Sequence, residues 1–365
     1  MMRITVIPLL LLSFVTANGF GQKPYEYAVP VALADGWKTN DFRSRPIDTT
    51  KIYRLFGQLQ QGEHKLHSIL LAKNSEIVIE EYFDGNTVDK QHDLRSATKS
   101  ITSILLGIAI DKGFIASIDD PISKYIKGPV YTLALDGGKD KITIRHLVTM
   151  SSGLDCNDWD KGSKGQEDKV YRKQNWIQYF LALPLGNEPG TVSNYCTMGQ
   201  VLSAEIISLA SGITLDKFAD KYLFGPMGIT NMSWGHTSKR EVIPSAKRAY
   251  MTTRDMAKIG LLVLHKGKWN DQQLVSEHWI AEATAGHTKI TGLDYGYLWW
   301  NIPFRVNDKI VLSKAALGNG GQYILIFPEV DMVAVFTGGA YNSEQDKLPF
   351  AIMTDVFLPA FIAEK

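Results

Sequence analysis

Residues 92–110 read HDLRSATKSITSILLGIAI and place a polar run directly before an apolar one. In the polar run, Ser96 and Lys99 are three residues apart, which puts a hydroxyl and an amine on one face of a helix. The apolar run continues to Gly113 and predicts a helix buried in a core. Lys99 would then lie on the first turn of a buried helix, where desolvation lowers the pKa of an amine toward that of a working base.

Ser96 and Lys99 are therefore a candidate nucleophile and general base. Unpaired backbone N–H groups at the start of the helix offer donors for an oxyanion. The alternative is that Ser96 caps the helix and Lys99 is a surface residue whose stem lies along apolar neighbours. These residues form the single Ser-x-x-Lys in the sequence, but chance alone produces about one such match in a chain of this length.

Composition and the N-terminus bound the class of protein. The chain has 365 residues, a formal net charge of +1 and 45% hydrophobic residues, which suits one large domain or two that share a core. No basic excess indicates a nucleic-acid partner. Residues 1–21 carry Arg3, an apolar run and then small residues, which is typical of a secretory signal peptide; an N-terminal anchor is the alternative. We expect cleavage near residue 21 and an exported protein, periplasmic or secreted, that is not stably inserted in a membrane. The sequence does not indicate its oligomeric state.

The two cysteines, Cys156 and Cys196, lack the spacing of metal ligands. In an exported protein they can form one disulfide, or they can remain two buried thiols. A disulfide would tie the polar stretch 155–173, interpreted as an exposed loop, to the segment around Tyr195. The sequence contains no His-Glu-x-x-His pattern, and we predict neither a metal nor a cofactor.

Strand patterns occur at both ends of the chain, and the middle is helical. Residues 67–73 and 76–83 flank a polar turn and predict a hairpin. Four further strands are predicted between residues 296 and 337, with short connections that favour antiparallel pairing. We therefore predict an α/β fold of the α+β type, with an antiparallel sheet of about five to six strands flanked by helices. The predicted division is a signal peptide (1–21), a sheet domain (22–118 and 244–365) and an inserted, mostly helical subdomain (119–243), with the active site at their interface.

Two further segments suit a hydrolytic site. Before a predicted helix at 198–211, a Pro-Gly turn at 189–190 is followed by Tyr195 and Thr197, which can point into a cleft. A phenol beside a cationic amine can share its proton relay, although a tyrosine at a helix start also commonly packs in a core. Residues 316–322, ALGNGGQ, place glycines at a strand edge, where a backbone N–H can donate to an oxyanion; the alternative is a flexible turn.

The three segments, in this order and at these spacings, resemble the serine β-lactamase and penicillin-binding-protein superfamily. The similarity is greatest to its class C-like branch, which includes family VIII carboxylesterases, D-aminopeptidases and 6-aminohexanoate-dimer hydrolases. It extends over nearly all of the chain after residue 21 and includes HLVTMSSGL at 146–154 and MTTRDMAK at 251–258. The resemblance implies the fold of that superfamily and a two-step acyl transfer at a serine.

Residue by residue, the resemblance makes Ser96 the acylated nucleophile and Lys99 its general base. Tyr195 would be the tyrosine of the family's Tyr-x-Asn element and would assist Lys99. The backbone N–H groups of Ser96 and Asn319 would form the oxyanion hole. The resemblance thus implies a serine hydrolase that works through an acyl-enzyme.

The predicted substrate-binding residues, Thr197, Ala316, Leu317 and Gly318, depart from the family pattern. Thr197 stands where the Tyr-x-Asn element has asparagine. Ala316 to Gly318 take the place of Lys-Thr-Gly, so the lysine that helps to hold a substrate carboxylate is missing. We expect a small-molecule ester, amide or peptide substrate; the alternatives are a D-Ala-D-Ala peptidase, a class C-like β-lactamase, or a non-catalytic binding protein. Four tryptophans are candidates for an apolar acyl pocket or for the core: Trp159, Trp176, Trp299 and Trp300.

Overall fold

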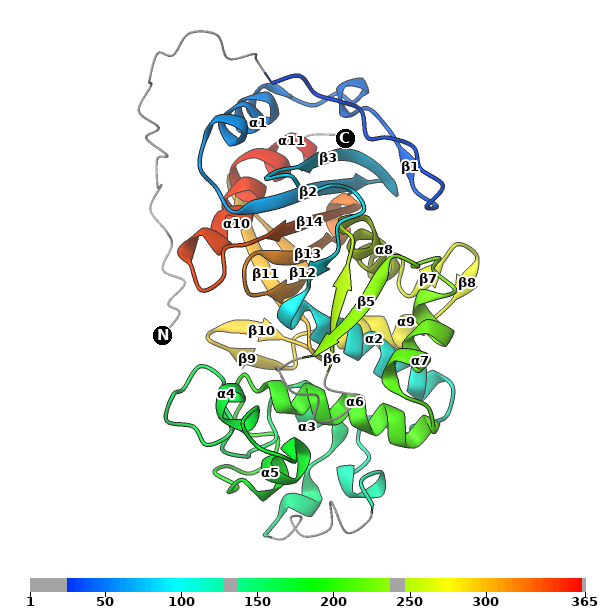
Figure 1. Ribbon diagram of the computed structural model, residues 1–365, viewed down its shortest axis with the longest axis vertical. Helices are drawn as coiled ribbons and strands as arrows, with labels where there is room; N and C mark the ends of the chain where they lie inside the picture. The colour runs from blue at the N-terminus through cyan, green and yellow to red at the C-terminus, as the bar shows by residue number, and fades with distance from the viewer. Residues whose placement is uncertain (1–24, 128–136, 237–246, 363–365) are drawn as a thin grey trace.

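The computed structural model describes residues 25–127, 137–236 and 247–362 (Figure 1). The predicted signal peptide at residues 1–21 lies outside the described residues. The predicted α/β fold class is confirmed, because one large sheet carries helices and a mostly helical part is inserted between its two halves. That arrangement follows from the sequence, in which strand patterns at both chain ends must bury their apolar faces together.

The large sheet joins the two ends of the chain. Within the described residues it has nine strands in the order β1-β3-β2-β14-β13-β12-β11-β10-β9. The two chain ends meet where β2 pairs with β14 in antiparallel fashion, with Leu71 opposite Ala334. The strands are β1 (Lys38–Thr39), β2 (Leu66–Lys73), β3 (Glu76–Tyr82), β9 (Thr288–Ile290), β10 (Leu293–Tyr295), β11 (Trp300–Val306), β12 (Lys309–Gly318), β13 (Gln322–Phe327) and β14 (Met332–Gly338).

The prediction of five to six strands undercounts the sheet. Six strands of six or more residues agree with it, and the additional three are β1, β9 and β10, each of two or three residues. Strands this short carry no readable alternation of apolar and polar residues, so periodicity does not detect them. The predicted antiparallel pairing is confirmed for the six longer strands. The short strand β1, which was not predicted, pairs with β3 in parallel.

Helices cover both faces of the sheet, so every residue of β13 and β14 is buried. On one side α8 packs on β2, β13 and β14; on the other, the C-terminal helical segment packs on β11 and α1 (Figure 1). Residues 348–362 form two short α-helices joined by the π-helical segment Met353–Phe357. The helices are α1 (Thr50–Gln61), α2 (Thr98–Asp111), α8 (Thr253–Leu264), α9 (Glu277–Ala283), α10 (Leu348–Ile352) and α11 (Leu358–Ile362).

The inserted part contains α3 (Ile144–Val148), α4 (Glu167–Val170), α5 (Trp176–Ala182), α6 (Thr197–Ser211) and α7 (Leu215–Ala219). A small sheet of β4 (His92–Asp93), β6 (Lys247–Met251) and β5 (Met232–His236) lies beside the start of α2. A two-stranded hairpin, β7 (Lys268–Trp269) with β8 (Gln272–Gln273), follows α8.

The domain division stays a prediction, and its second boundary at 243/244 lies outside the described residues. Among the described helices none alone is long and apolar enough to cross a membrane; α6 meets that test only together with the segment Leu215–Phe224, from which it is bent by 75°.

Gly107 allows α2 and α9 to pack closely. A Cβ at residue 107 would lie 2.2 Å from Trp279 Cδ1, and the indole of Trp279 is fixed because its Nε1 donates to the Ser103 carbonyl at 3.0 Å. We expect Gly107→Ala to lower the free energy of unfolding by about 1–3 kcal/mol, because overpacking outweighs the better helix propensity of alanine.

Gly57 in α1 is the matched control, since within the described residues no atom lies within 4 Å of a Cβ placed there. Gly57→Ala should raise the free energy of unfolding by about 0.5–1 kcal/mol. Urea denaturation of both variants measures the difference. Equal changes in the two variants would contradict the packing argument.

Arg254 of α8 joins three distant segments through a buried ion network. Its side chain is 3% exposed, and its Nε and Nη2 donate to Glu80 of β3 at 2.7 and 2.5 Å. Nη1 donates to Asp35 at 2.9 Å and Nη2 to the Val31 carbonyl at 2.7 Å. The segment before β1 is thereby attached to the sheet and to α8 by charge-assisted hydrogen bonds.

Candidate active site

Ser96 and Lys99 lie where α2 begins. Ser96 is in a 3₁₀ turn, Arg95–Ala97, that runs into α2, and Lys99 Nζ donates to Ser96 Oγ at 3.1 Å. Arg95 has a φ of 51°, a left-handed conformation that a residue with a side chain adopts rarely. Its backbone N–H donates to Asp93 Oδ1 at 3.0 Å, so the turn that carries Ser96 is held from the preceding strand.

Tyr195 lies over this pair, immediately before α6. Lys99 Nζ is 5.1 Å from the centre of the Tyr195 ring. Both side chains are largely buried, with 5% of Lys99 and 7% of Tyr195 exposed. The structure therefore brings together the three predicted catalytic residues, which come from two segments about a hundred residues apart.

The predicted direction of the pKa of Lys99 is wrong. Burial lowers the pKa of Lys99, as expected, but Tyr195, Glu167 and Asp158 together outweigh it, and the pKa is raised above its usual value of 10.5. Asp158 and Glu167 belong to the polar stretch 155–173, whose carboxyl groups were expected in solvent. Residues 155–173 contain many charged side chains, and the sequence does not indicate that these two point inward.

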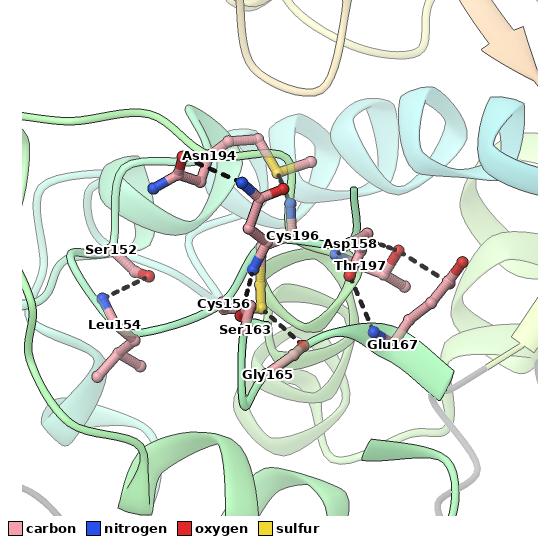
Figure 2. The surroundings of a disulfide bond; sticks show 12 residues. Ser152, Leu154, Cys156, Asp158, Ser163, Gly165, Glu167, Asn194, Cys196 and Thr197 are labelled. Carbon is pink, nitrogen blue, oxygen red and sulfur yellow. Dashed lines mark hydrogen bonds between the residues drawn. A yellow bond between two sulfur atoms is a disulfide. The ribbon is translucent and has the colours of Figure 1, made fainter. Parts of the chain in front are cut away.

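Asp158 binds the segment that carries Tyr195 and Thr197. Its carboxylate Oδ2 accepts hydrogen bonds from the Thr197 backbone N–H and hydroxyl, both at 2.7 Å, as Figure 2 shows. Glu167 lies on the other side of that hydroxyl at 3.3 Å and also accepts a hydrogen bond from Tyr171 at 2.9 Å. Burial, followed by the neighbouring Glu167, raises the pKa of Asp158 to about 6. The Thr197 hydroxyl proton is thus directed to a carboxylate of this chain.

A disulfide fixes the same region (Figure 2). It joins Cys156 to Cys196, the residue between Tyr195 and Thr197. Of the two alternatives for these cysteines, the structure therefore has the disulfide. The loop that carries Asp158 is covalently attached to the segment that carries Tyr195.

The glycine-rich segment lies on the other side of Ser96. A Cβ on Gly318 would be 2.2 Å from the Leu94 carbonyl oxygen, so the end of β12 approaches the turn before Ser96 closely enough to require glycine. Asn319 follows the strand, and its side chain exchanges hydrogen bonds with Asn342 at 2.9 and 3.0 Å. Ala316 is 1% exposed and Leu317 half-buried, within β12. The roles predicted for Ser96 and Asn319 in the oxyanion hole, and for residues 316–318 in substrate binding, stay predictions.

An aromatic wall extends from Tyr195 toward solvent. The indole of Trp159 stacks on the Tyr195 ring with centres 4.8 Å apart, and Trp300 lies 5.9 Å from the same ring. Trp159 is 51% exposed, whereas Trp300 is buried. The other two tryptophans considered for an acyl pocket, Trp176 and Trp299, belong to the core.

Two other features lie outside this cluster. A cavity of about 410 Å³ is lined by Gly137, Gly138, Lys141 and residues 185–189 and includes none of the three catalytic candidates. Among the described side chains, no group of three or more His, Cys, Asp or Glu residues is arranged to hold a metal ion.

Comparisons with known proteins identify the family of the chain. The sequence model of the Beta-lactamase family matches residues 56–351. The chain is 22% identical to the 6-aminohexanoate-dimer hydrolase of Paenarthrobacter ureafaciens over 293 residues, covering 73% of this chain and 71% of that protein. It is 24% identical to an uncharacterized protein of Alkalihalophilus pseudofirmus over 329 residues, covering 79% and 87% of the two chains.

Solved structures show the same fold. A putative 6-aminohexanoate-dimer hydrolase from Bacillus anthracis superposes with a TM-score of 0.68 at 18% identity, covering 84% of this chain and 81% of that one. A class C beta-lactamase superposes with a TM-score of 0.60 at 15% identity, covering 84% and 95%. The resemblance predicted from the sequence is confirmed: this chain belongs to the beta-lactamase family, whose named relatives include hydrolases.

Proposed function

We propose that this protein is a serine hydrolase that forms an acyl-enzyme on Ser96. The observation that carries the proposal is the 3.1 Å contact between Lys99 Nζ and Ser96 Oγ, with the Tyr195 ring beside the same amine. A hydroxyl within hydrogen-bond reach of an amine and a phenol has a route for its proton when it attacks a carbonyl. A core-packing role for Lys99 would not require its ammonium group to point at a serine.

In the proposed reaction, Ser96 Oγ attacks an ester or amide carbonyl and its proton passes to the Lys99–Tyr195 pair. The leaving alcohol or amine takes up a proton from that pair, and water then releases the acyl group. Because the pKa of Lys99 is raised, the amine is cationic at neutral pH. The pair accepts a proton only after it has lost one, so we expect turnover to rise from neutral toward alkaline pH.

A fluorophosphonate probe tests the proposal directly. It should add covalently to the wild-type protein, and peptide mass spectrometry should place the adduct on Ser96. Labelling should disappear in Ser96→Ala and persist in Ser103→Ala. A protein that the probe leaves unmodified would support a non-catalytic binding role instead.

The charges near Ser96 favour neutral or cationic substrates over carboxylates. Ala316 is uncharged where the family has lysine, and the carboxyl groups of Asp158 and Glu167 influence Lys99. Arg95, the cation next to Ser96, lies over the Tyr341 ring and shares Asp93 with Arg248, at distances of 3.2 and 3.5 Å. An anionic substrate group would therefore meet less positive charge here than a lysine in place of Ala316 would supply.

We expect a neutral short-chain p-nitrophenyl ester to acylate Ser96 at least about tenfold faster than benzylpenicillin. Tenfold corresponds to about 1.4 kcal/mol, the free energy that benzylpenicillin loses when one charge contact to its carboxylate is missing. Stopped-flow release of p-nitrophenol gives the first rate, and competition against a fluorescent penicillin gives the second. Faster acylation by penicillin would favour the D-Ala-D-Ala peptidase or β-lactamase alternatives.

We also propose that the protein is exported. The signal-peptide pattern of residues 1–21 supports this, and so does the Cys156–Cys196 disulfide, because such bonds persist mainly in oxidising compartments. N-terminal sequencing of the mature protein from cell fractions tests it.

A further inference from the structure

Five interactions link residues 156–159 to residues 195–197. The Asp158 backbone N–H donates to the Tyr195 carbonyl at 2.8 Å, and the Asp158 carboxylate accepts two hydrogen bonds from Thr197. Between these contacts the Cys156–Cys196 disulfide joins the two segments covalently (Figure 2). The next residue, Trp159, stacks on the Tyr195 ring at an interplanar angle of 1°. Tyr195 is therefore fixed on its backbone and on its ring by one short loop.

The same loop is the source of charge around Lys99. Burial lowers the pKa of Lys99, and the groups that raise it are Tyr195, Glu167 and Asp158. Around Asp158 the charged groups are Glu167 and Lys99, and Glu167 N–H donates to Asp158 Oδ1 at 3.2 Å. The Asp158 carboxylate is thus bound to the Glu167 backbone, and both carboxyl groups act on Lys99. Arg248 is a further cation near this cluster, since it acts on Tyr171, whose hydroxyl donates to Glu167.

Resting on the proposed function, we propose that Asp158 is a positioning residue of this hydrolase, which holds Tyr195 against Lys99 through Thr197 and the Tyr195 backbone. It does not touch the reacting atoms. A helix cap for α6 would explain the bond to the Thr197 N–H. A helix cap would not explain the additional hydrogen bonds to the Thr197 hydroxyl and the Tyr195 carbonyl. Nor would it explain why the Asp158 carboxylate lies close enough to Lys99 to raise its pKa.

Four variants separate position from charge. Asp158→Ala removes the carboxylate contacts and the charge, whereas Asp158→Asn removes the charge and keeps an oxygen that accepts from Thr197 N–H. Glu167→Gln removes a charge near Lys99 and leaves the Asp158 contacts. The control is Asp160→Asn, an exposed carboxylate of the same loop that accepts from the Gly162 N–H at 2.7 Å.

Esterase kinetics as a function of pH give the first readout. We expect Asp158→Ala to lower the limiting kcat at alkaline pH at least about tenfold, because small displacements of a catalytic group cost that much or more. Asp158→Asn and Glu167→Gln should keep most of that limiting kcat, but the rise in rate should move to lower pH, because a lost negative charge favours the neutral amine. Asp160→Asn should match the wild type. Melting temperatures separate these effects from loss of the fold.

The pKa of Lys99, measured by competitive labelling with acetic anhydride and peptide mass spectrometry, gives a second readout that requires no turnover. It should fall in Asp158→Asn and stay unchanged in Asp160→Asn. An unchanged labelling pKa, or a wild-type limiting kcat in a folded Asp158→Ala, would overturn the assignment of Asp158. Absence of Ser96-dependent turnover in the wild type would instead overturn the proposed function, and the labelling result would still decide whether Asp158 acts on Lys99.

Discussion

Replacing Ser96 by alanine is expected to lower kcat/KM for short-chain p-nitrophenyl esters on the order of 10⁴-fold or more, the loss seen when a catalytic serine is removed. The reason is chemical, since Lys99 and Tyr195 have no hydroxyl left to activate and the acyl-enzyme cannot form. The fold should persist, because Ser96 Oγ contributes one hydrogen bond from Lys99 in the structure. Initial rates of p-nitrophenol release, with melting temperatures of both proteins, measure the effect.

Ser103 is the matched control for this substitution. It lies in α2, seven residues after Ser96, and its buried hydroxyl has no hydrogen-bond partner within the described residues. Removing such a group is expected to leave both activity and stability close to the wild type. Ester hydrolysis that survives in Ser96→Ala would remove the acyl-enzyme mechanism.

Replacing Arg254 by leucine is expected to have the largest effect on stability. The substitution leaves Glu80, whose side chain is 6% exposed, as an uncompensated buried carboxylate, and it releases Asp35 and the Val31 carbonyl. Breaking a buried ion pair from one side costs about 3–5 kcal/mol in the free energy of unfolding. Urea denaturation followed by circular dichroism measures this cost.

Arg43 provides a contrasting ion pair at the surface. It contacts Asp41 at 2.6 Å, and its side chain is 49% exposed. Solvent screens such a pair, so Arg43→Leu should leave the denaturation midpoint unchanged. Arg254→Leu together with Glu80→Leu should recover part of the lost stability, because no charge is then left buried. A midpoint for Arg254→Leu equal to that of the wild type would contradict the role assigned to the network.

The sequence was sufficient for the elements that carry long, regular patterns. The helix after Ser96 and the six longer strands could be predicted, since an apolar run or an alternation over six or more residues reports burial directly. The sequence did not predict the three short strands β1, β9 and β10. Strands of two or three residues form by pairing with a neighbour that the sequence does not identify. The parallel pairing of β1 with β3 depends on the same long-range contact.

The candidate site shows the same limit in its electrostatics. Ser96 and Lys99 are local neighbours, so their contact follows from helical spacing. The direction of the pKa change of Lys99 does not follow from helical spacing. It depends on Asp158 and Glu167, which are about sixty residues away in the sequence and are brought close to Lys99 by a loop. Among the many charges of residues 155–173, only three-dimensional structure distinguishes the two that turn inward.

The pairing of β2 with β14 also determines when the large sheet of this protein can be completed. Leu71 and Ala334 are neighbours in the finished sheet, yet roughly 260 residues are synthesised between them, which takes on the order of 13–50 s at about 5–20 residues per second. During that interval the apolar edge of β2 has no partner strand and is open to pairing with other chains. We therefore expect the growing chain to depend on a chaperone until its last strand has been made. A chain that stops before β14 should aggregate rather than fold in part.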